Sequence, residues 1–272
     1  MLSDRLRQFL NILFAVAQPF VAILASIGFT GPDVGTVSRQ YPTYVVPAGY
    51  TFSIWTLIYA LSLGYAVLQA FPSEKANPLL RRIGWLTAYA MASTSAWILV
   101  FQRSYFLASL VIMAGLLISL IGVVALMYRS FHRDGARISR AENWLVYGTF
   151  SIFLGWVSVA TVANVGQTLT ALGWDRQGVP EESWGVFVLL FVGLIAVIVT
   201  AATRGNMPFA LTIIWALIGI AVNQFTRAVP TSSNTVGAVA VNMAVLVGVV
   251  MMIAHRKNNY WQVGKSGQAI KT

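Results

Sequence analysis

The sequence predicts an all-α, polytopic transmembrane helical bundle, and three features of its 272 residues point to that class. First, 57% of the residues are hydrophobic and only 10% are charged, whereas a soluble domain carries roughly 25% charged residues. Second, the apolar residues gather in runs long enough to cross about 30 Å of hydrocarbon as helices. Third, Lys and Arg, which give a formal charge of +10, lie mostly between these runs. Membrane topology explains that arrangement, so no nucleic-acid partner is expected.

The first apolar run is too long for the core of a signal peptide and leads into further membrane segments, so we expect a retained span. Only Gln102, Arg103 and Ser104 separate the third run from the fourth, which predicts a tight helical hairpin. The fifth run, from Trp144, is longer than a span requires, and the last is rich in Val, Ala and Gly. In chain order, the eight expected spans cover residues 9–29, 50–71, 82–101, 105–128, 144–170, 184–203, 208–226 and 234–254.

The distribution of basic residues predicts the orientation of these spans. Eight spans place both termini on one side, together with the second, fourth and sixth loops. That side carries 14 Lys and Arg residues: Arg5, Arg7, Lys75, Arg81, Arg82, Arg129, Arg133, Arg137, Arg140, Arg204, Arg256, Lys257, Lys265 and Lys271. The other side carries only Arg39, Arg103, Arg176 and Arg227. Both termini are therefore expected in the cytoplasm, as for a protein of a bacterial inner membrane, and almost no cation is expected in the interior.

The chain contains no Cys, which excludes disulfides and thiolate metal sites. Its histidines, His132 and His255, lie beside Arg in expected cytoplasmic segments and have no second ligand at metal-binding spacing. No carboxylate pair or Ser-His-Asp arrangement lies in a span. We therefore expect no metal site and no catalytic residues, and no cofactor is required by the residues themselves.

The first external loop, residues 30–49, is the longest connection on its side and contains Pro42, Pro47, Tyr41 and Tyr44. A loop of this length is either a lid or binding element, or an ordered cap with interfacial tyrosines. The sequence leaves both interpretations open.

Aromatic and polar residues form stripes along three of the spans. In the fifth span Trp156, Ala160 and Asn164 are four residues apart, which puts them on one helix face. Lipid offers no partner for an indole N–H or an amide, so this face is expected against protein, a cavity or a ligand. Two further stripes are Phe52, Trp55 and Tyr59 in the second span and Trp97 and Phe101 in the third. Each stripe is also compatible with simple helix packing.

Together these stripes resemble the TspO/translocator-protein family, also called tryptophan-rich sensory proteins. In that family a Trp follows the second proline of a Pro-Pro pair by eight residues and leads into Trp-Thr-x-x-Tyr. Here Pro47 precedes Trp55 by eight residues, and Tyr59 completes the second motif. Val46 replaces the first proline of the pair.

The third and fifth spans extend the resemblance. Trp97 and Phe101 match the family pattern, while Thr94 stands where that pattern has Asn. Trp156, Ala160 and Asn164 match the fifth-helix motif at full spacing, although Ile152 and Phe153 replace its Pro-Tyr pair. The resemblance covers residues 9–171 and implies a five-helix core domain over 1–171. Residues 172–272 then form a second domain of three added helices and a basic cytoplasmic tail.

The resemblance implies a pocket inside the five-helix core that binds porphyrin, haem or another flat hydrophobic ligand. The expected ligand-binding residues are Pro47, Trp55, Tyr59, Trp97, Phe101, Trp156, Ala160 and Asn164. The protein would act as a sensor, carrier, receptor or regulator, and light-dependent porphyrin degradation is also known in the family. Two alternatives remain: a small-solute transporter or facilitator, and a structural subunit of a larger membrane complex. A homodimer is compatible with each of them.

Overall fold

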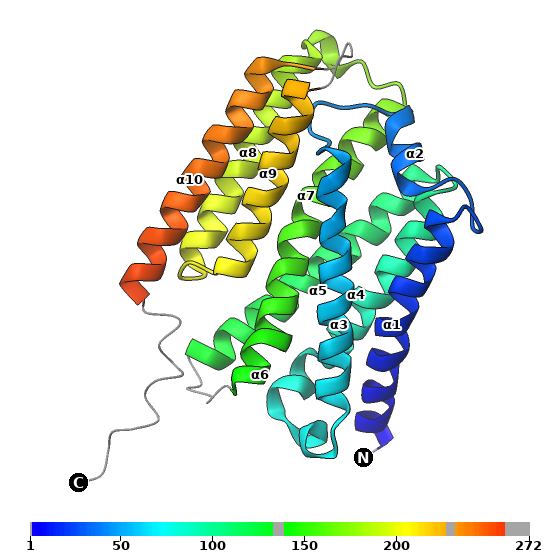
Figure 1. Ribbon diagram of the computed structural model, residues 1–272, viewed down its shortest axis with the longest axis vertical. Coiled ribbons are helices and arrows are strands. Elements are labelled where there is room, and N and C mark those ends of the chain that lie inside the picture. Colours follow the sequence, from blue (N-terminus) through cyan, green and yellow to red (C-terminus); the bar gives the residue numbers. More distant parts are fainter. Residues whose placement is uncertain (1, 133–138, 227–231, 259–272) are drawn as a thin grey trace.

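The computed structural model describes residues 2–132, 139–226 and 232–258, and every long element among them is an α-helix (Figure 1). Eight helices are long and apolar enough to cross a membrane, which confirms the predicted fold class. The spans are Ser3–Ser26, Gly49–Ala70, Pro78–Phe101, Phe106–Phe131, Asn143–Ala171, Glu181–Ala202, Met207–Thr226 and Asn234–Arg256. The first begins earlier and ends earlier than predicted, because its charged first turn continues the helix.

The long helices are α1 (Leu2–Ser26), α3 (Ile54–Ala70), α4 (Pro78–Phe101), α5 (Phe106–His132), α7 (Thr149–Ala171), α8 (Glu181–Ala202), α9 (Met207–Thr226) and α10 (Asn234–Asn258). Shorter elements are α2 (Val34–Gln40), α6 (Arg140–Glu142), and the turns η1 (Gly49–Ser53), η2 (Pro72–Ala76), η3 (Asn143–Gly148) and η4 (Arg176–Gly178). The fifth span is longer than a single α-helix because the π-helical turn η3 continues into α7.

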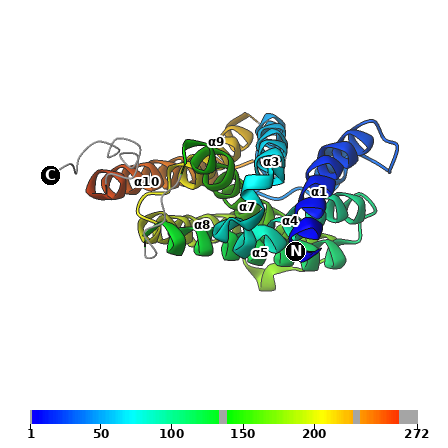
Figure 2. The ribbon, with the colours of Figure 1, turned by 90° about the horizontal axis from the view of Figure 1, so that it is seen from below.

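Five helices form a closed ring in the order α1, α3, α7, α5, α4, with α4 packed against α1 (Figure 2). The remaining helices, α8, α9 and α10, pack against one another as a three-helix unit. The unit joins the ring mainly through α9, which lies against α7. The two packing groups coincide with the division predicted at residue 171, although whether they are separate domains stays a prediction.

Close contact between α7 and α9 depends on Gly155. A Cβ at this position would lie 2.9 Å from Thr212 Cβ and 3.0 Å from the backbone oxygen of Phe209. Nearby, Asn206 Nδ2 donates a hydrogen bond to Ser151 Oγ at 2.9 Å. Small and polar side chains therefore hold the two groups together, as in many membrane helix pairs.

The start of α1 and the end of α10 lie at the same end of the bundle, which we call the terminal end, and α2 lies at the opposite end (Figure 1). This arrangement agrees with eight spans. The cytoplasmic position of the terminal end stays a prediction, and Arg133, Arg137, Arg227, Lys265 and Lys271 of the charge count lie outside the described residues.

Arg7 is a buried cation, an exception of the kind that the expectation of almost no interior cations allows. Its side chain is only 1% exposed. The guanidinium donates hydrogen bonds to the carbonyl oxygens of Leu80, at 2.8 Å, and Lys75, at 3.0 Å. Gly84 leaves the space for it, since a Cβ there would lie 2.5 Å from Arg7 Cδ. These hydrogen bonds to backbone carbonyls of η2 and α4 make burial of this cation possible.

Candidate functional site

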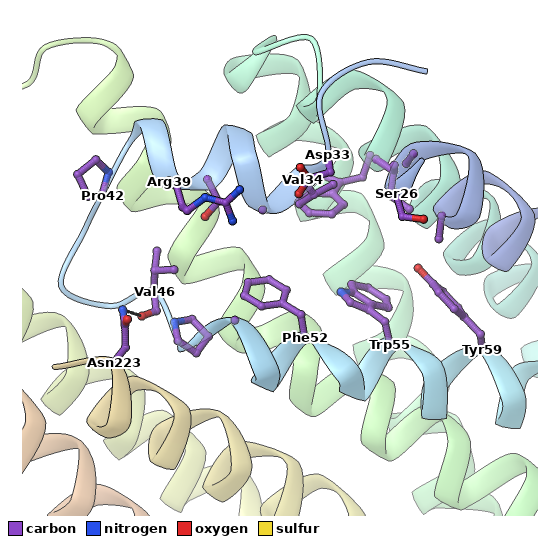
Figure 3. A pocket seen from close by; sticks show the side chains of 18 residues that line it. Ser26, Asp33, Val34, Arg39, Pro42, Val46, Phe52, Trp55, Tyr59 and Asn223 are labelled. Carbon is purple, nitrogen blue, oxygen red and sulfur yellow. Dashed lines mark hydrogen bonds between the residues drawn. The ribbon is translucent and has the colours of Figure 1, made fainter. Parts of the chain in front are cut away.

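A cavity of about 520 Å³ opens beside α2, at the end of the ring remote from the termini (Figure 3). Its walls come from α1, α3 and α4, from α2 and the loop that follows it, and from Asn223 of α9. A small inner extension of about 30 Å³ reaches α7. The two spaces share wall residues, among them Pro47, Trp55 and Trp97, so they are adjacent, and we refer to them together as the chamber.

The structure brings all eight sequence-predicted residues together around this chamber. Pro47, Trp55, Tyr59 and Trp97 line the larger space. The inner extension is lined by Pro47, Trp55, Trp97, Phe101, Trp156, Ala160 and Asn164. The stripe on α7 therefore faces a cavity, as its spacing predicts, and its role in binding a ligand stays a prediction.

Aromatic rings build one wall of the chamber. Trp55 stacks on Tyr59 with ring centroids 5.6 Å apart and an interplanar angle of 22°. The edge contact between Trp55 and Trp156, at 6.2 Å, joins α3 to α7, and Phe52 makes a similar contact with Trp156 at 5.5 Å. Figure 3 shows Phe52, Trp55 and Tyr59 in a row along η1 and α3 that faces the cavity. Such a wall suits a flat apolar ligand.

Asn164 orients the opposite wall. Its Oδ1 accepts a hydrogen bond from Trp97 Nε1 at 3.1 Å, and its Nδ2 donates to Ser109 Oγ at 3.1 Å. Trp97 in turn stacks on Phe101 with centroids 5.0 Å apart. Asn164 is only 1% exposed and its amide is occupied by these bonds, so its role here is to fix the position of Trp97.

Trp97 donates its indole N–H to Asn164, whereas the indole N–H of Trp156 is not used in this way. Trp156 is 1% exposed, and its Nε1 has no hydrogen-bond partner among the described residues. A buried donor without a partner is costly. Trp156 therefore carries an unused donor and lines the inner extension.

Polar residues of the first external loop form the rim. Asp33 caps α2, with Oδ1 accepting from the Thr36 backbone N–H at 3.0 Å and Oδ2 accepting from the Thr36 hydroxyl. Arg39 donates to Thr36 Oγ1 at 2.7 Å. The side-chain hydrogen bond from Thr36, helped by its backbone N–H and by Arg39, lowers the pKa of the Asp33 carboxyl. The loop is thus an ordered helical cap that also lines a cavity, and both interpretations left open by the sequence describe part of it.

Arg39 is a candidate binding residue that the sequence analysis did not select. It is exposed and lines the cavity across from the aromatic row, as Figure 3 shows. The sequence contained information that could have identified it, because Arg39 is one of few cations on its expected side of the membrane and lies in the longest external loop.

Helix α9 holds the segment that carries Pro47. Four hydrogen bonds join them: Ala48 N to Gly219 O at 2.9 Å, Asn223 Nδ2 to Val46 O at 2.9 Å, Gln224 Nε2 to Tyr44 O at 2.8 Å, and Trp215 Nε1 to Thr51 O at 3.0 Å. Asn223 and Gln224 lie near the end of α9, and both side chains belong to this contact. The three-helix unit therefore supports one wall of the cavity.

The described residues contain no cluster of three or more His, Asp or Glu side chains that could hold a metal ion. The side chain of His132 lies outside the described part of the chain.

Comparison with protein families gives a match over residues 8–253 to the family described as TSPO-like protein. The match extends past residue 171 and includes the three-helix unit. Comparison with curated proteins and with solved structures gives no match.

Proposed function

Because the chain belongs to the TSPO-like family, we propose that it binds a tetrapyrrole in the chamber beneath α2 and acts as a membrane sensor, carrier or regulator. The family and the eight apolar helices identify an integral, multi-pass membrane protein. The ligand and the role are the proposed part.

The observation that carries the proposal is the convergence of three stripes of aromatic and polar residues, predicted from separate spans, on one cavity. At about 520 Å³ the cavity falls within the range of roughly 300–1,000 Å³ typical of ligand sites. The row of Phe52, Trp55 and Tyr59 offers a flat apolar surface, and Trp97 faces it from α4. A planar macrocycle would replace water on these faces and bury a large apolar area.

The polar groups of the site support the same ligand class. A porphyrin carries propionates along one edge and ring edges that are largely apolar elsewhere. Arg39 at the rim is placed to pair with a carboxylate, and the open side of the cavity lets that carboxylate keep part of its water. The Trp156 N–H offers a neutral donor at depth.

The lining residues fit a porphyrin ring better than they fit the iron of haem. They include no His, Cys or Met, the usual axial ligands, and Tyr59 is the lining residue type that could ligate ferric iron. We therefore propose that the affinity arises from the ring and its propionates. On this view metal-free protoporphyrin binds about as well as haem.

Titration of the purified protein with protoporphyrin IX tests the proposal. Saturable quenching of tryptophan fluorescence is expected with micromolar-scale affinity, about −8 kcal/mol. The Trp55→Ala, Trp156→Ala double variant should weaken binding by roughly 1–3 kcal/mol, since each stacked ring contributes about 0.5–1.5 kcal/mol beyond its area.

A matched control is Trp85→Ala, which removes an indole that is 44% exposed on the outside of α4. Its affinity should equal that of the unchanged protein. If the double variant also binds normally, the ligand lies elsewhere. If no porphyrin binds and the purified protein lacks a Soret band, the facilitator and complex-subunit alternatives gain.

A further inference from the structure

A stripe of polar side chains runs along α1 on the face turned to the interior of the ring. Arg7, Asn11 and Gln18 are spaced by four and seven residues, and each is at most 1% exposed. The same face continues through Ala22 and Ala25, which line the cavity. The stripe therefore leads from the terminal end of the bundle to the floor of the cavity.

In the part of the stripe near the terminal end, Arg7 and Asn11 form hydrogen bonds with other groups of the protein. Asn11 Oδ1 accepts from Thr87 Oγ1 at 2.7 Å, and the Tyr65 hydroxyl lies 3.0 Å from the same Thr87 oxygen. Arg7 is bound to backbone carbonyls of η2 and α4. These residues join α1, α3 and α4 and leave little capacity for another molecule.

Gln18 lacks such partners. Its side chain is fully buried, and neither Nε2 nor Oε1 has a hydrogen-bond partner in the part of the chain that the structure describes. Ser62 of α3 is also fully buried, and its Oγ likewise has no partner in that part of the chain. Gln18 precedes Ala22 by four residues, and Ser62 follows Tyr59 by three, so each lies one turn deeper than a residue that lines the cavity. Two helices thus place unpaired polar groups directly below the aromatic chamber.

We propose that Gln18 and Ser62 form a polar subsite beneath the cavity, which binds a neutral hydrogen-bonding group of the ligand such as a hydroxyl or an amide. The inference rests on the proposed function for the identity of the ligand body. A carboxamide provides donors and an acceptor, and a hydroxyl provides one of each, so the pair can satisfy a group of mixed character.

Charge decides which end of a ligand enters this subsite. The surrounding segments, residues 8–26, 54–70 and 83–101, contain no Lys, Arg, Asp or Glu. A carboxylate there would be buried without a cation, which is strongly unfavourable. The cation of the site is Arg39, at the rim. A ligand with an acidic edge and a neutral polar edge should therefore bind in one orientation, with its acidic edge at the rim.

Two matched porphyrins test the subsite. Mesoporphyrin IX and haematoporphyrin IX share a ring and propionates, and differ by hydroxyls on the side chains at the edge remote from the propionates. Gln18→Met should lower the ratio of haematoporphyrin to mesoporphyrin affinity roughly 10-fold, because a buried hydrogen bond is lost at nearly constant side-chain shape. Ser62→Ala should lower it roughly 3-fold.

The control is Gln8→Met, which changes a glutamine of α1 that bonds Gln69 O at 2.6 Å, far from the cavity. It should leave the ratio unchanged. If Gln18→Met also leaves the ratio unchanged while both porphyrins bind, the subsite is refuted and the proposed function stands.

The chain has no Cys, so a thiol introduced at Ser62 can be followed alone. In the protein without porphyrin, Ser62→Cys should react with hydroxyethyl methanethiosulfonate faster than Ser119→Cys, because Ser119 is buried on α5 and bonds its own helix. Equal rates would refute the subsite even if neither porphyrin binds. Faster reaction in that case would keep a polar subsite while the tetrapyrrole function fails.

Discussion

The five-helix ring and the three-helix unit bury different kinds of side chain. The ring encloses Arg7, Asn11, Gln18 and Asn164, together with the aromatic chamber. The unit is packed mostly through small and aliphatic residues: along α10 the buried positions are Val236, Gly237, Ala240, Ala244 and Val247. Small side chains let membrane helices approach closely, whereas indoles and phenols hold them apart. The ring can therefore contain a binding site, and the unit is suited to supporting it.

The support is specific, because α9 contacts the cavity wall through hydrogen bonds as well as packing. Its polar side chains Asn223 and Gln224 bond the backbone of the loop at Val46 and Tyr44. If the ring contains the binding site and the unit supports it, substitutions at the α7–α9 contact should lower the stability of the protein. Substitutions inside the chamber should lower its affinity for the ligand.

The largest expected effect comes from enlarging Gly155 at that contact. Gly155→Ala should lower the free energy of unfolding by about 1–3 kcal/mol, because the new methyl group meets the Phe209 backbone and Thr212. Thermal unfolding in detergent measures the change. Gly166→Ala on the same helix is the control, since its Cβ would lie 3.5 Å from Thr43, an ordinary contact. Equal stability of the two variants would show that the ring and the unit are loosely joined.

Ala160→Leu tests the ring, because it changes a residue inside the chamber. It overpacks the inner extension at a cost of about 1–3 kcal/mol. Protoporphyrin affinity, measured by fluorescence quenching, should fall more than the melting temperature does. The exposed Ala60 of α3 gives the control substitution Ala60→Leu, which should affect neither. A parallel fall of affinity and stability would mean that the stripe is a helix contact and not a ligand wall.

Asn223→Leu tests whether the unit supports the cavity. Loss of the hydrogen bond to Val46 O should weaken protoporphyrin binding by about 0.5–1.5 kcal/mol, because the wall around Pro47 becomes less ordered. Asn242→Leu removes an amide from the exposed face of α10 and should leave affinity unchanged. If the two variants bind alike, α9 holds the wall without influence on the ligand.

The smallest expected effect is a pH dependence of the rim. The Asp33 pKa is lowered by the hydrogen bond from Thr36, so the ionised form is favoured in the folded protein. Its contribution is fully present above the ordinary pKa of 3.8 and is lost as pH falls through the lower folded value. Hydrogen exchange of residues 34–40, corrected for the intrinsic rate, should show reduced protection in that acidic range.

Asp33→Asn provides the comparison for this pH effect, because Asn still caps a helix but does not titrate there. Protection of α2 in this variant should be independent of pH across the same range. An identical loss of protection in both proteins would assign the acid effect to another group.

Much of the fold and of the site could be predicted from the sequence. Apolar runs fixed the number of spans, because a helix must satisfy its backbone in lipid and needs a defined length to cross it. Helical spacing fixed which residues share a face, and so Trp156, Ala160 and Asn164 were correctly placed on one inward stripe.

Only the tertiary structure decided which faces meet. The sequence shows Arg7 at a helix start but not the carbonyls of Leu80 and Lys75 that accept its hydrogen bonds and allow its burial. It shows Asn223 near a helix end, yet the partner, Val46, is 177 residues away. The unpaired amide of Gln18 is likewise visible only once its neighbours are placed. Periodicity is a local property of a single helix, whereas the partner of a buried polar group depends on how distant helices pack, and that information is not contained in any one segment.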